Sequence, residues 1–279
     1  MNKITAAKMR EYKLHLINEE KSENTTKKYT HDIKIFADWT EGRSINKPLV
    51  LEYKEKLKKE YAASSVNSIL SSLNSFFDFC GNSKLKVKTL KIQKQIFAGK
   101  ERELSTAEYS RLLTASKSEG NERLFLLMQT ICGTGIRVSE LQYITAESIK
   151  AGKARINMKG KLRIVIIPSA LCKALSKYAK KRGITSGSIF LSRNGRPLDR
   201  CNIWRMMRSI CEKADVEKEK VFPHNLRHLF ARTYYSLQKD IVRLADILGH
   251  TSVNTTRIYT METGDIHRRQ IEHLGLLRC

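Results

Sequence analysis

The stretch GTGIRVSEL, residues 133–141, places a helix end and a helix start within nine residues of one another. Its two glycines favour the end of the helix predicted at 121–132, and the next helix is predicted to begin at Arg137. A turn this tight holds Arg137 at a fixed position instead of on a solvated helix face. Because a guanidinium is permanently charged and donates paired hydrogen bonds, we expect Arg137 to bind an anionic group.

The second half of the chain is otherwise mostly helical, with one short segment of a different kind. Residues 153–157 (KARIN) and 162–167 (LRIVII) are rich in β-branched side chains and meet at MKGK, residues 158–161, where the glycine permits a hairpin turn. Ser105 and Glu108 form a capping box at the start of the first helix of this half. Helices are predicted at 105–117, 121–132, 137–143, 169–182, 199–214, 224–238, 240–248, 252–260 and 265–274.

The first hundred residues show helical periodicity and no strand pattern. Helices are predicted at 6–20, 25–40, 47–60 and 63–80. Asn24 or Thr25 is the expected cap of the second of these helices. A lysine-rich segment without strong periodicity follows the fourth helix. We therefore predict a mainly α protein with three parts: an all-α N-terminal domain at 1–95, a linker at 96–103, and a mixed α/β domain with a small antiparallel sheet at 104–279.

The chain has 279 residues and is strongly basic, since 52 Lys and Arg against 28 Asp and Glu give a formal charge of +24. The excess is spread along the chain, with 19 basic and 11 acidic residues in 1–98 and 33 and 17 in the remainder. Such a charge repels itself and is typical of proteins whose partner is a polyanion. Nucleic acid is the expected partner, bound with strong salt dependence because Lys and Arg contacts release counterions from phosphate.

Composition and cysteine spacing exclude several other classes of protein. Hydrophobic residues make up 41% and charged residues 29%, as in ordinary globular proteins, so a disordered chain is excluded. No apolar run approaches the roughly 18 residues that span a bilayer, and the N-terminus has no export signal. The six cysteines include no C-x-x-C pair, which argues against a zinc ribbon or a disulfide scaffold. We expect a soluble, cytoplasmic protein with reduced thiols.

Two histidines stand four residues apart in HNLRH, residues 224–228, and this spacing places both on one helix face. The same spacing occurs in zinc proteases, whose H-E-x-x-H motif needs a glutamate as general base. Asn225 occupies that position here, so the sequence argues against a metalloprotease. His224 also precedes Arg227 by three residues, about one helical turn, so both side chains can face one phosphate.

Four motifs in this order resemble those of the tyrosine recombinases, the phage-integrase and Xer-like group. They are GTGIRVSEL, a lysine in the hairpin turn, HNLRH, and LGH at 248–250 followed nine residues later by Tyr259. The resemblance covers nearly the whole chain, and the N-terminal helical segment resembles the core-binding, SAM-like domain of the family. It implies a site-specific DNA recombinase that cleaves and rejoins strands through a 3′-phosphotyrosyl intermediate, in DNA integration, excision, inversion or resolution.

The resemblance assigns the binding of the scissile phosphate to four residues of this sequence. Arg137 and Arg227 match the two family arginines that donate hydrogen bonds to the nonbridging phosphate oxygens. His224 and His250 match the positions that hydrogen-bond the phosphate and assist proton movement. Gly249 is expected to end the preceding helix and to present His250 at a turn.

The resemblance also assigns the nucleophile and the general acid. Tyr259 matches the nucleophile; a phenol has a reference pKa of about 10, so its attack at neutral pH needs neighbouring cations and a proton acceptor. Tyr234 and Tyr235 are the nearest alternatives. Lys159 matches the hairpin lysine that protonates the departing 5′ oxygen, and Lys161 competes for this role because the turn is so short.

Other polar residues near these motifs are expected to play supporting parts. His228 is expected to be a buried, hydrogen-bonded support. Glu140 either orients Arg137 or completes its helix, and both roles are consistent with the sequence. Arg163 and Lys153 are interpreted as contacts to backbone phosphates.

The resemblance further implies double-stranded DNA as partner, a homotetramer on two DNA sites and accessory DNA-bending or directionality proteins, with no cofactor, metal ion or membrane. The fourth predicted helix carries Ser and Asn where relatives often have Arg, and no arm-binding domain is expected before the first helix. The apolar tail between 266 and 277 either docks on a neighbouring protomer or packs on its own domain.

Two rival functions are a type IB topoisomerase, which relaxes one duplex, and a DNA-binding regulator that does not cleave.

Overall fold

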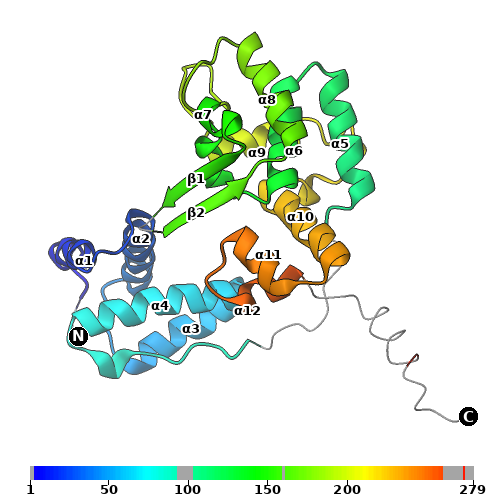
Figure 1. The fold of residues 1–279 in the computed structure, drawn as a ribbon. Coiled ribbons are helices and arrows are strands. Elements are labelled where there is room, and N and C mark those ends of the chain that lie inside the picture. The colour runs from blue at the N-terminus through cyan, green and yellow to red at the C-terminus, as the bar shows by residue number, and fades with distance from the viewer. Residues whose placement is uncertain (1–2, 93–102, 159–160, 260–272, 274–279) are drawn as a thin grey trace, which may run out of the picture. The chain divides into compact units, whose positions relative to one another are not determined.

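The structure is a computed structural model that describes residues 3–92, 103–158, 161–259 and 273. The chain forms two compact units, residues 1–94 and 95–279, each of which is described by itself (Figure 1). Except for Glu103, the linker predicted at 96–103 lies outside the described residues. The same holds for the helix predicted at 265–274, of which only His273 is described.

The first unit is entirely helical in its described part, as predicted. Its elements are α1 (Ala6–Asn18), α2 (Glu23–Thr40), α3 (Lys47–Glu60), α4 (Ala63–Phe79) and the short 3-10 helix η1 (Ser83–Leu85). The predicted cap of α2 was wrong. The helix begins earlier, because the Ser22 hydroxyl accepts a hydrogen bond from the Thr25 backbone N–H at 3.3 Å, and neither Asn24 nor Thr25 is the cap.

Aromatic side chains from all four long helices fill the core of this unit. The Phe36 ring lies 4.9 Å from that of Tyr53 and 6.1 Å from that of Phe77, measured between centroids. Tyr12 packs edge-on to Phe76 and donates a hydrogen bond to the Ser75 hydroxyl at 2.9 Å. The apolar face of α4 contributes five fully buried side chains, those of Val66, Leu70, Leu73, Phe76 and Phe77.

The second unit is mainly helical around one small sheet, so the predicted fold class is confirmed. Its helices are α5 (Thr106–Ser118), α6 (Glu122–Thr134), α7 (Ala146–Lys150), α8 (Ser169–Lys181), α9 (Arg200–Arg208), α10 (Pro223–Gln238), α11 (Ile241–Leu248) and α12 (Val253–Thr256). Its 3-10 helices are η3 (Val138–Tyr143), η4 (Lys218–Lys220) and η5 (Arg257–Tyr259). In the part of the chain that the structure describes, no helix combines the length and apolar character needed to cross a bilayer.

The predicted hairpin is present as two antiparallel strands, β1 (Lys153–Met158) and β2 (Lys161–Ile166), paired from Lys153 with Ile166 to Met158 with Lys161. Its inner face packs on the core through Ala154, Ile156 and Val165, which are at most 3% exposed. Side chains alternate between the faces of a strand, so the outer face carries an exposed apolar row from β2. This row consists of Leu162, Ile164 and Ile166.

Among the differences between the predicted and the observed helices of this unit, one predicted helix is a 3-10 helix, one ends earlier, and one observed helix was not predicted. Each of these three differences has a local reason. The segment predicted as a helix at 137–143 is a 3-10 helix, in a turn that the Glu140 side chain closes by accepting a hydrogen bond from the Arg137 backbone N–H. Helix α9 ends at Arg208 because the chain turns at 209–215, where Asp215 takes a φ of +50°. Helix α7 was missed because five residues are too few to show periodicity; its cap, Thr145 with Ser148, was the available signal.

Helices α6 and α11 both end at a glycine in the left-handed conformation, and α10 packs against both of them. Gly135 has a φ of +63° and Gly249 a φ of +62°. A Cβ at Gly135 would lie 2.5 Å from the Phe230 ring, so this position excludes any side chain. Two helix ends are thereby brought to one place on α10, at Arg227.

We predict that Gly135→Ala lowers the free energy of unfolding by about 2–4 kcal/mol, because it combines left-handed strain with the clash against Phe230. Gly120→Ala is the matched control, since Gly120 has the same φ of +63° but open space around its Cα. The control should lose only about 1 kcal/mol. Denaturant unfolding followed by circular dichroism measures both, and equal losses would contradict the role given to the close approach.

Candidate functional site

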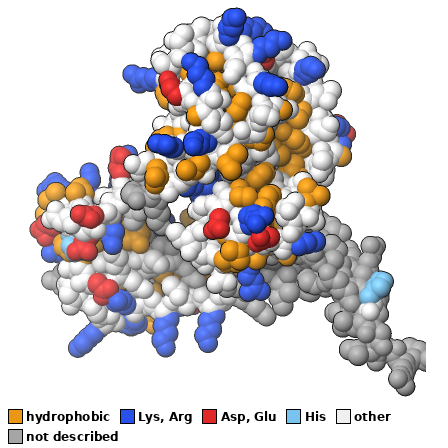
Figure 2. Space-filling model, viewed as in Figure 1, with side chains coloured by type: hydrophobic (Ala, Val, Ile, Leu, Met, Phe, Trp, Pro, Cys, Tyr) orange, Lys and Arg blue, Asp and Glu red, His pale blue; other side chains and the backbone are white. Residues whose placement is uncertain are grey.

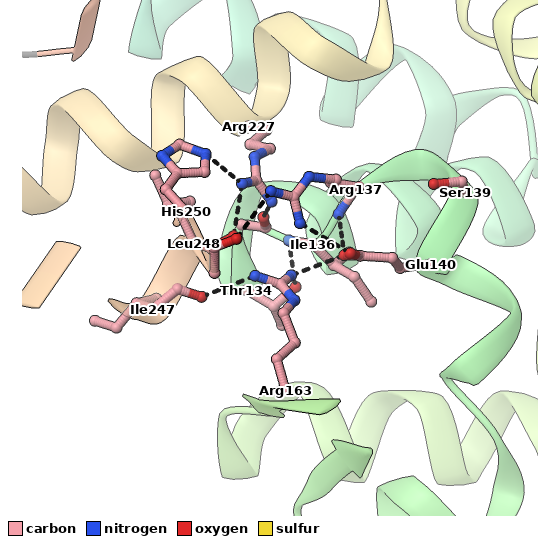
Figure 3. A network of polar contacts seen from close by, with 12 residues as sticks. Thr134, Ile136, Arg137, Ser139, Glu140, Arg163, Arg227, Ile247, Leu248 and His250 are labelled. Atoms are coloured by element: carbon pink, nitrogen blue, oxygen red, sulfur yellow. Dashed lines mark hydrogen bonds and ion pairs between the residues drawn. The ribbon is translucent and has the colours of Figure 1, made fainter. Parts of the chain in front are cut away.

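The site is built around Arg227, a guanidinium that is only 2% exposed on α10. Its Nη1 donates a hydrogen bond to the carbonyl of Gly135, and its Nη2 donates to the carbonyl of Leu248 at 2.8 Å (Figure 3). Both carbonyls belong to helix C-termini, which leave carbonyls without intrahelical partners and carry partial negative charge. The ends of α6 and α11 thus compensate the buried charge of Arg227.

Arg137 and Arg163 share one buried carboxylate, that of Glu140, which is 4% exposed. Arg137 Nη1 donates to Glu140 Oε1 at 3.0 Å, and Arg163 Nη2 donates to Oε2 at 2.8 Å (Figure 3). The Arg137 backbone N–H also donates to Oε2, and Arg137 Nη2 donates to the carbonyl of Gly249 at 3.2 Å. Glu140 therefore fulfils both roles that the sequence left open: it orients Arg137 and closes its turn.

Arg163, interpreted from the sequence as a phosphate contact, pairs with groups of the protein itself. Its side chain lies on the inner face of β2, is 13% exposed, and is held by Glu140 and by the carbonyl of Ile247 at 3.1 Å. Burial lowers the pKa of Arg163, and the charge of Glu140 opposes that fall. Arg163 thus ties the sheet to the end of α11, two residues before Gly249. Lys153, by contrast, is exposed on β1.

His250 follows Gly249, which ends α11 as predicted, and both of its ring nitrogens have partners. The Nε2 atom lies 3.0 Å from Arg227 Nη2, and the Nδ1 atom lies 2.9 Å from the hydroxyl of Thr256. Burial, and then the positive charges of Arg227 and Arg137, lower the pKa of His250 to about 4. The imidazole is therefore neutral at pH 7.

His224 and His228 form a pair on α10, with their Nε2 atoms 3.0 Å apart. Loss of hydration and the nearby charge of Arg227 lower the pKa of His224, although this residue remains exposed. Burial and the neighbouring His224 lower the pKa of His228 to about 4. With both rings neutral at pH 7, one donates and the other accepts in this hydrogen bond. His228 is half-buried and hydrogen-bonded, as expected of a support.

Tyr259 ends η5 and is 4% exposed. Its ring lies edge-on to His228, at 4.5 Å between centroids, and nearly parallel to His250 at 5.9 Å. Its phenol interacts with the Arg227 guanidinium, and this interaction opposes the fall in the pKa of Arg227 caused by burial and by Arg137. The phenol therefore lies against the central cation of the site. Its apolar neighbours are Ala231, Leu244 and Leu248.

The general-acid candidates and the alternative nucleophiles remain to be placed. Lys159 lies outside the described residues, and so does the side chain of Lys161, its competitor. Tyr234 and Tyr235, the alternative nucleophiles, are partly buried on α10 and pack against the apolar cluster that contains Tyr259. The structure therefore brings together five of the six predicted site residues, namely Arg137, His224, Arg227, His250 and Tyr259.

An open cleft of about 710 Å³ lies over this network. It is lined in part by Arg137, Ser139, Glu140, Arg163, Gly249 and His250. Three guanidinium groups, with one carboxylate and neutral imidazoles, leave an excess of positive charge that suits an anion such as a phosphodiester. Lys and Arg side chains are also spread over the visible surface of this unit (Figure 2). Among the described residues, no group of three His, Cys, Asp or Glu could hold a metal ion.

The sequence analysis missed Thr256 and did not predict the inward direction of Arg163. Thr256 carried no motif signal, and its importance appears only through its contact with His250. The inward direction of Arg163 was available from strand alternation, because it shares a face with Val165, whereas Leu162 and Ile164 face outward. This alternation could not be recognised from hydropathy, because apolar residues around Arg163 occupy both faces of the strand.

Comparison with known proteins places this geometry in a family. Residues 102–264 match the phage integrase family, and residues 9–83 match the N-terminal SAM-like domain of phage integrases. The chain belongs to the phage integrase family. Tyrosine recombinase XerA of Pyrococcus furiosus is 30% identical over 96% of this chain and 94% of its own length. The chain is thus an enzyme of the tyrosine recombinase class.

Solved structures agree with this assignment. A crystal structure of XerA recombinase has 27% identity and a TM-score of 0.54, covering 98% of this chain and 99% of its own. A lambda integrase dimer bound to a COC′ core site has a TM-score of 0.73 at 21% identity, with 95% and 97% coverage, and shares the fold.

Removing the Arg163 guanidinium should destabilise the site. We expect Arg163→Met to lower the free energy of unfolding by about 2–3 kcal/mol, because the buried Glu140 loses a charge-assisted hydrogen bond. Arg155→Met, on the exposed face of β1, is the matched control and should change stability by less than about 0.5 kcal/mol. Denaturant unfolding at pH 7 checks this, and an Arg163→Met variant as stable as the control would refute it.

The lowered histidine pKa values predict a loss of stability in acid. Between pH 6.5 and 4, His228 and His250 take up protons in the unfolded chain but not in the folded one. The free energy of unfolding should therefore fall as the pH drops through this range, by at most about 1.4 kcal/mol per pH unit for each group. His228→Gln should give a shallower dependence in denaturant titrations at several pH values; a slope identical to that of the wild type would argue against the shift.

Proposed function

We propose that this chain exchanges DNA strands at specific sites through a covalent 3′-phosphotyrosyl intermediate on Tyr259. The observation that supports this most directly is the contact of the Tyr259 phenol with the Arg227 guanidinium. Arg137 and His250 lie in the same network. Cations beside a phenol stabilise the negative charge that its oxygen carries as it attacks phosphorus.

The proposed step exchanges one ester for another. The Tyr259 oxygen forms a bond to phosphorus while the bond from phosphorus to the 5′ oxygen breaks, which leaves a 3′-phosphotyrosyl ester and a 5′-hydroxyl end. Arg137 and Arg227 donate hydrogen bonds to the nonbridging oxygens, and Lys159 gives the proton to the departing 5′ oxygen. The reverse reaction rejoins a strand without ATP, because the phosphotyrosyl ester conserves the energy of the cleaved bond.

The histidines complete this proposal as neutral groups. An imidazole that is uncharged at pH 7 presents a lone pair on one nitrogen and a proton on the other, so it can both accept and donate. We assign the hydrogen bonds to the phosphate and the uptake of the phenol proton to His224, exposed at the start of α10, and to His250, on the cleft, whose Nε2 must exchange Arg227 for the substrate to do so. The permanent positive charge is left to the arginines.

Double-stranded DNA is the proposed partner of both units. The charge of +24 is divided between them, and residues 9–83 match a domain of the phage integrases. We propose that residues 1–95 form a core-binding domain that binds the duplex. The domain at 104–279 contains the catalytic residues, and residues 96–103 link the two domains. The lambda integrase with which the chain shares its fold is bound to a DNA core site.

The stoichiometry of the chemistry favours four copies of the chain. Exchange between two duplexes requires the cleavage of four strands, and the proposal gives each chain one nucleophile, Tyr259. A homotetramer on two DNA sites supplies one tyrosine for each strand. Accessory DNA-bending or directionality proteins would then select integration, excision, inversion or resolution.

The decisive experiment is a nicked suicide substrate that carries the cognate site, from which the cleaved fragment diffuses away and traps the covalent complex. Wild-type protein should form an adduct that survives denaturation. Tyr259→Phe should reduce adduct formation by at least roughly 10⁴-fold, because the phenol oxygen is lost, while binding of intact DNA stays within about twofold.

Tyr234→Phe is the matched control and should still form the adduct. An adduct with Tyr259→Phe would reject this nucleophile. Specific binding by the wild type without an adduct would favour a DNA-binding regulator, and relaxation of supercoils without recombinant products would favour a topoisomerase.

A further inference from the structure

The two hydrogen bonds of His250 determine where its proton lies. Arg227 Nη2 stands 3.0 Å from Nε2, and the Thr256 hydroxyl stands 2.9 Å from Nδ1. A guanidinium has only donors, so Nε2 must accept and cannot carry a proton. A neutral imidazole has one proton, which must then be on Nδ1, and Nδ1 donates it to the Thr256 hydroxyl oxygen.

We propose that Thr256 is a positioning residue that fixes His250 as the Nδ1–H tautomer and so keeps Nε2 as the proton-accepting atom beside Arg227. The catalytic consequence of this inference rests on the function proposed above. Without the hydroxyl, the buried Nδ1–H loses its acceptor, so the ring can turn away from the guanidinium, and only then can the proton move to Nε2. The contact between His250 and Arg227 would be lost.

The setting of Thr256 suits this role. Its side chain is fully buried, so water does not compete for the Nδ1 proton. Thr256 is the last residue of α12, and Tyr259 follows at the end of η5. One short segment therefore carries both the hydroxyl that orients His250 and the phenol that stacks on its ring. The adjacent Thr255 is exposed and offers a matched control.

The charged groups that face His250 reinforce the neutral form. Arg227 from α10, Arg137 from the turn after α6, and Arg163 from β2 all oppose its protonation, and so does His224. Tyr259 covers the ring from η5. The positive charges of the three arginines are permanent, so their field favours a neutral His250 ring. This field does not choose between the two tautomers of the neutral ring. The hydrogen bonds at Nε2 and Nδ1 make that choice.

The tautomer is measured directly by nitrogen-15 NMR of histidine-labelled protein, with His250→Gln to identify the signal. Wild-type His250 should show a protonated Nδ1 and an unprotonated Nε2 from pH 8 to about 5. Thr256→Val, which keeps the shape and removes the hydroxyl, should shift the proton to Nε2 or give a mixture. Thr256→Ser and Thr255→Val should keep the wild-type pattern. A proton on Nε2 in the wild type, or no change in Thr256→Val, would overturn the inference.

Cleavage of the suicide substrate tests the consequence. Thr256→Val should slow adduct formation roughly 10- to 100-fold without weakening DNA binding, and should change its pH profile. Thr256→Ser should restore the rate to within about threefold, which a loss of packing alone would not predict. A normal rate and pH profile in Thr256→Val would refute a catalytic consequence. If the wild type forms no adduct while NMR shows the expected tautomer, the proposed function fails and the positioning of His250 by Thr256 stands.

Discussion

A buried guanidinium needs an acceptor for its donors, and this constraint organises the second unit of the chain. Arg227 is almost inaccessible to water, so protein groups must replace its hydration. The replacements are carbonyls at the ends of α6 and α11, both freed by glycines in the left-handed conformation. Burial of one charge thus fixes how three helices meet, and the turns that follow the two glycines bring in Arg137 and His250.

Charge in the site is divided between permanent and switchable groups. Arginines supply positive charge at any physiological pH, and their field lowers the pKa of the neighbouring histidines. The histidines are thereby kept neutral at pH 7. The buried Glu140 offsets part of the repulsion between Arg137 and Arg163, which lets two guanidinium groups lie on one carboxylate.

Much of this arrangement could be predicted from the sequence, because it depends on short-range geometry. The spacing of His224 and Arg227 fixes them on one face of a helix, and the glycines at 135 and 249 mark helix ends. The hairpin followed from its β-branched residues and its turn. Contacts between distant segments could not be predicted in this way: the bond from Arg163 to the end of α11 joins residues 84 positions apart, and nothing local signals it. Thr256 was missed for a related reason, since a threonine in a short helix has many possible partners.

The segment from His250 to Tyr259 brings three side chains of the site together. It holds the imidazole, the hydroxyl that orients it and the phenol that covers it, within ten residues of largely helical backbone. Each residue of a helix rotates the direction of the next side chain by about 100° around the helix axis. A one-residue insertion or deletion inside this segment would turn the phenol away from Arg227 even if every side chain were kept. The length of the segment is therefore under as strict a constraint as its chemistry, whereas longer loops of the protein are free to vary in length.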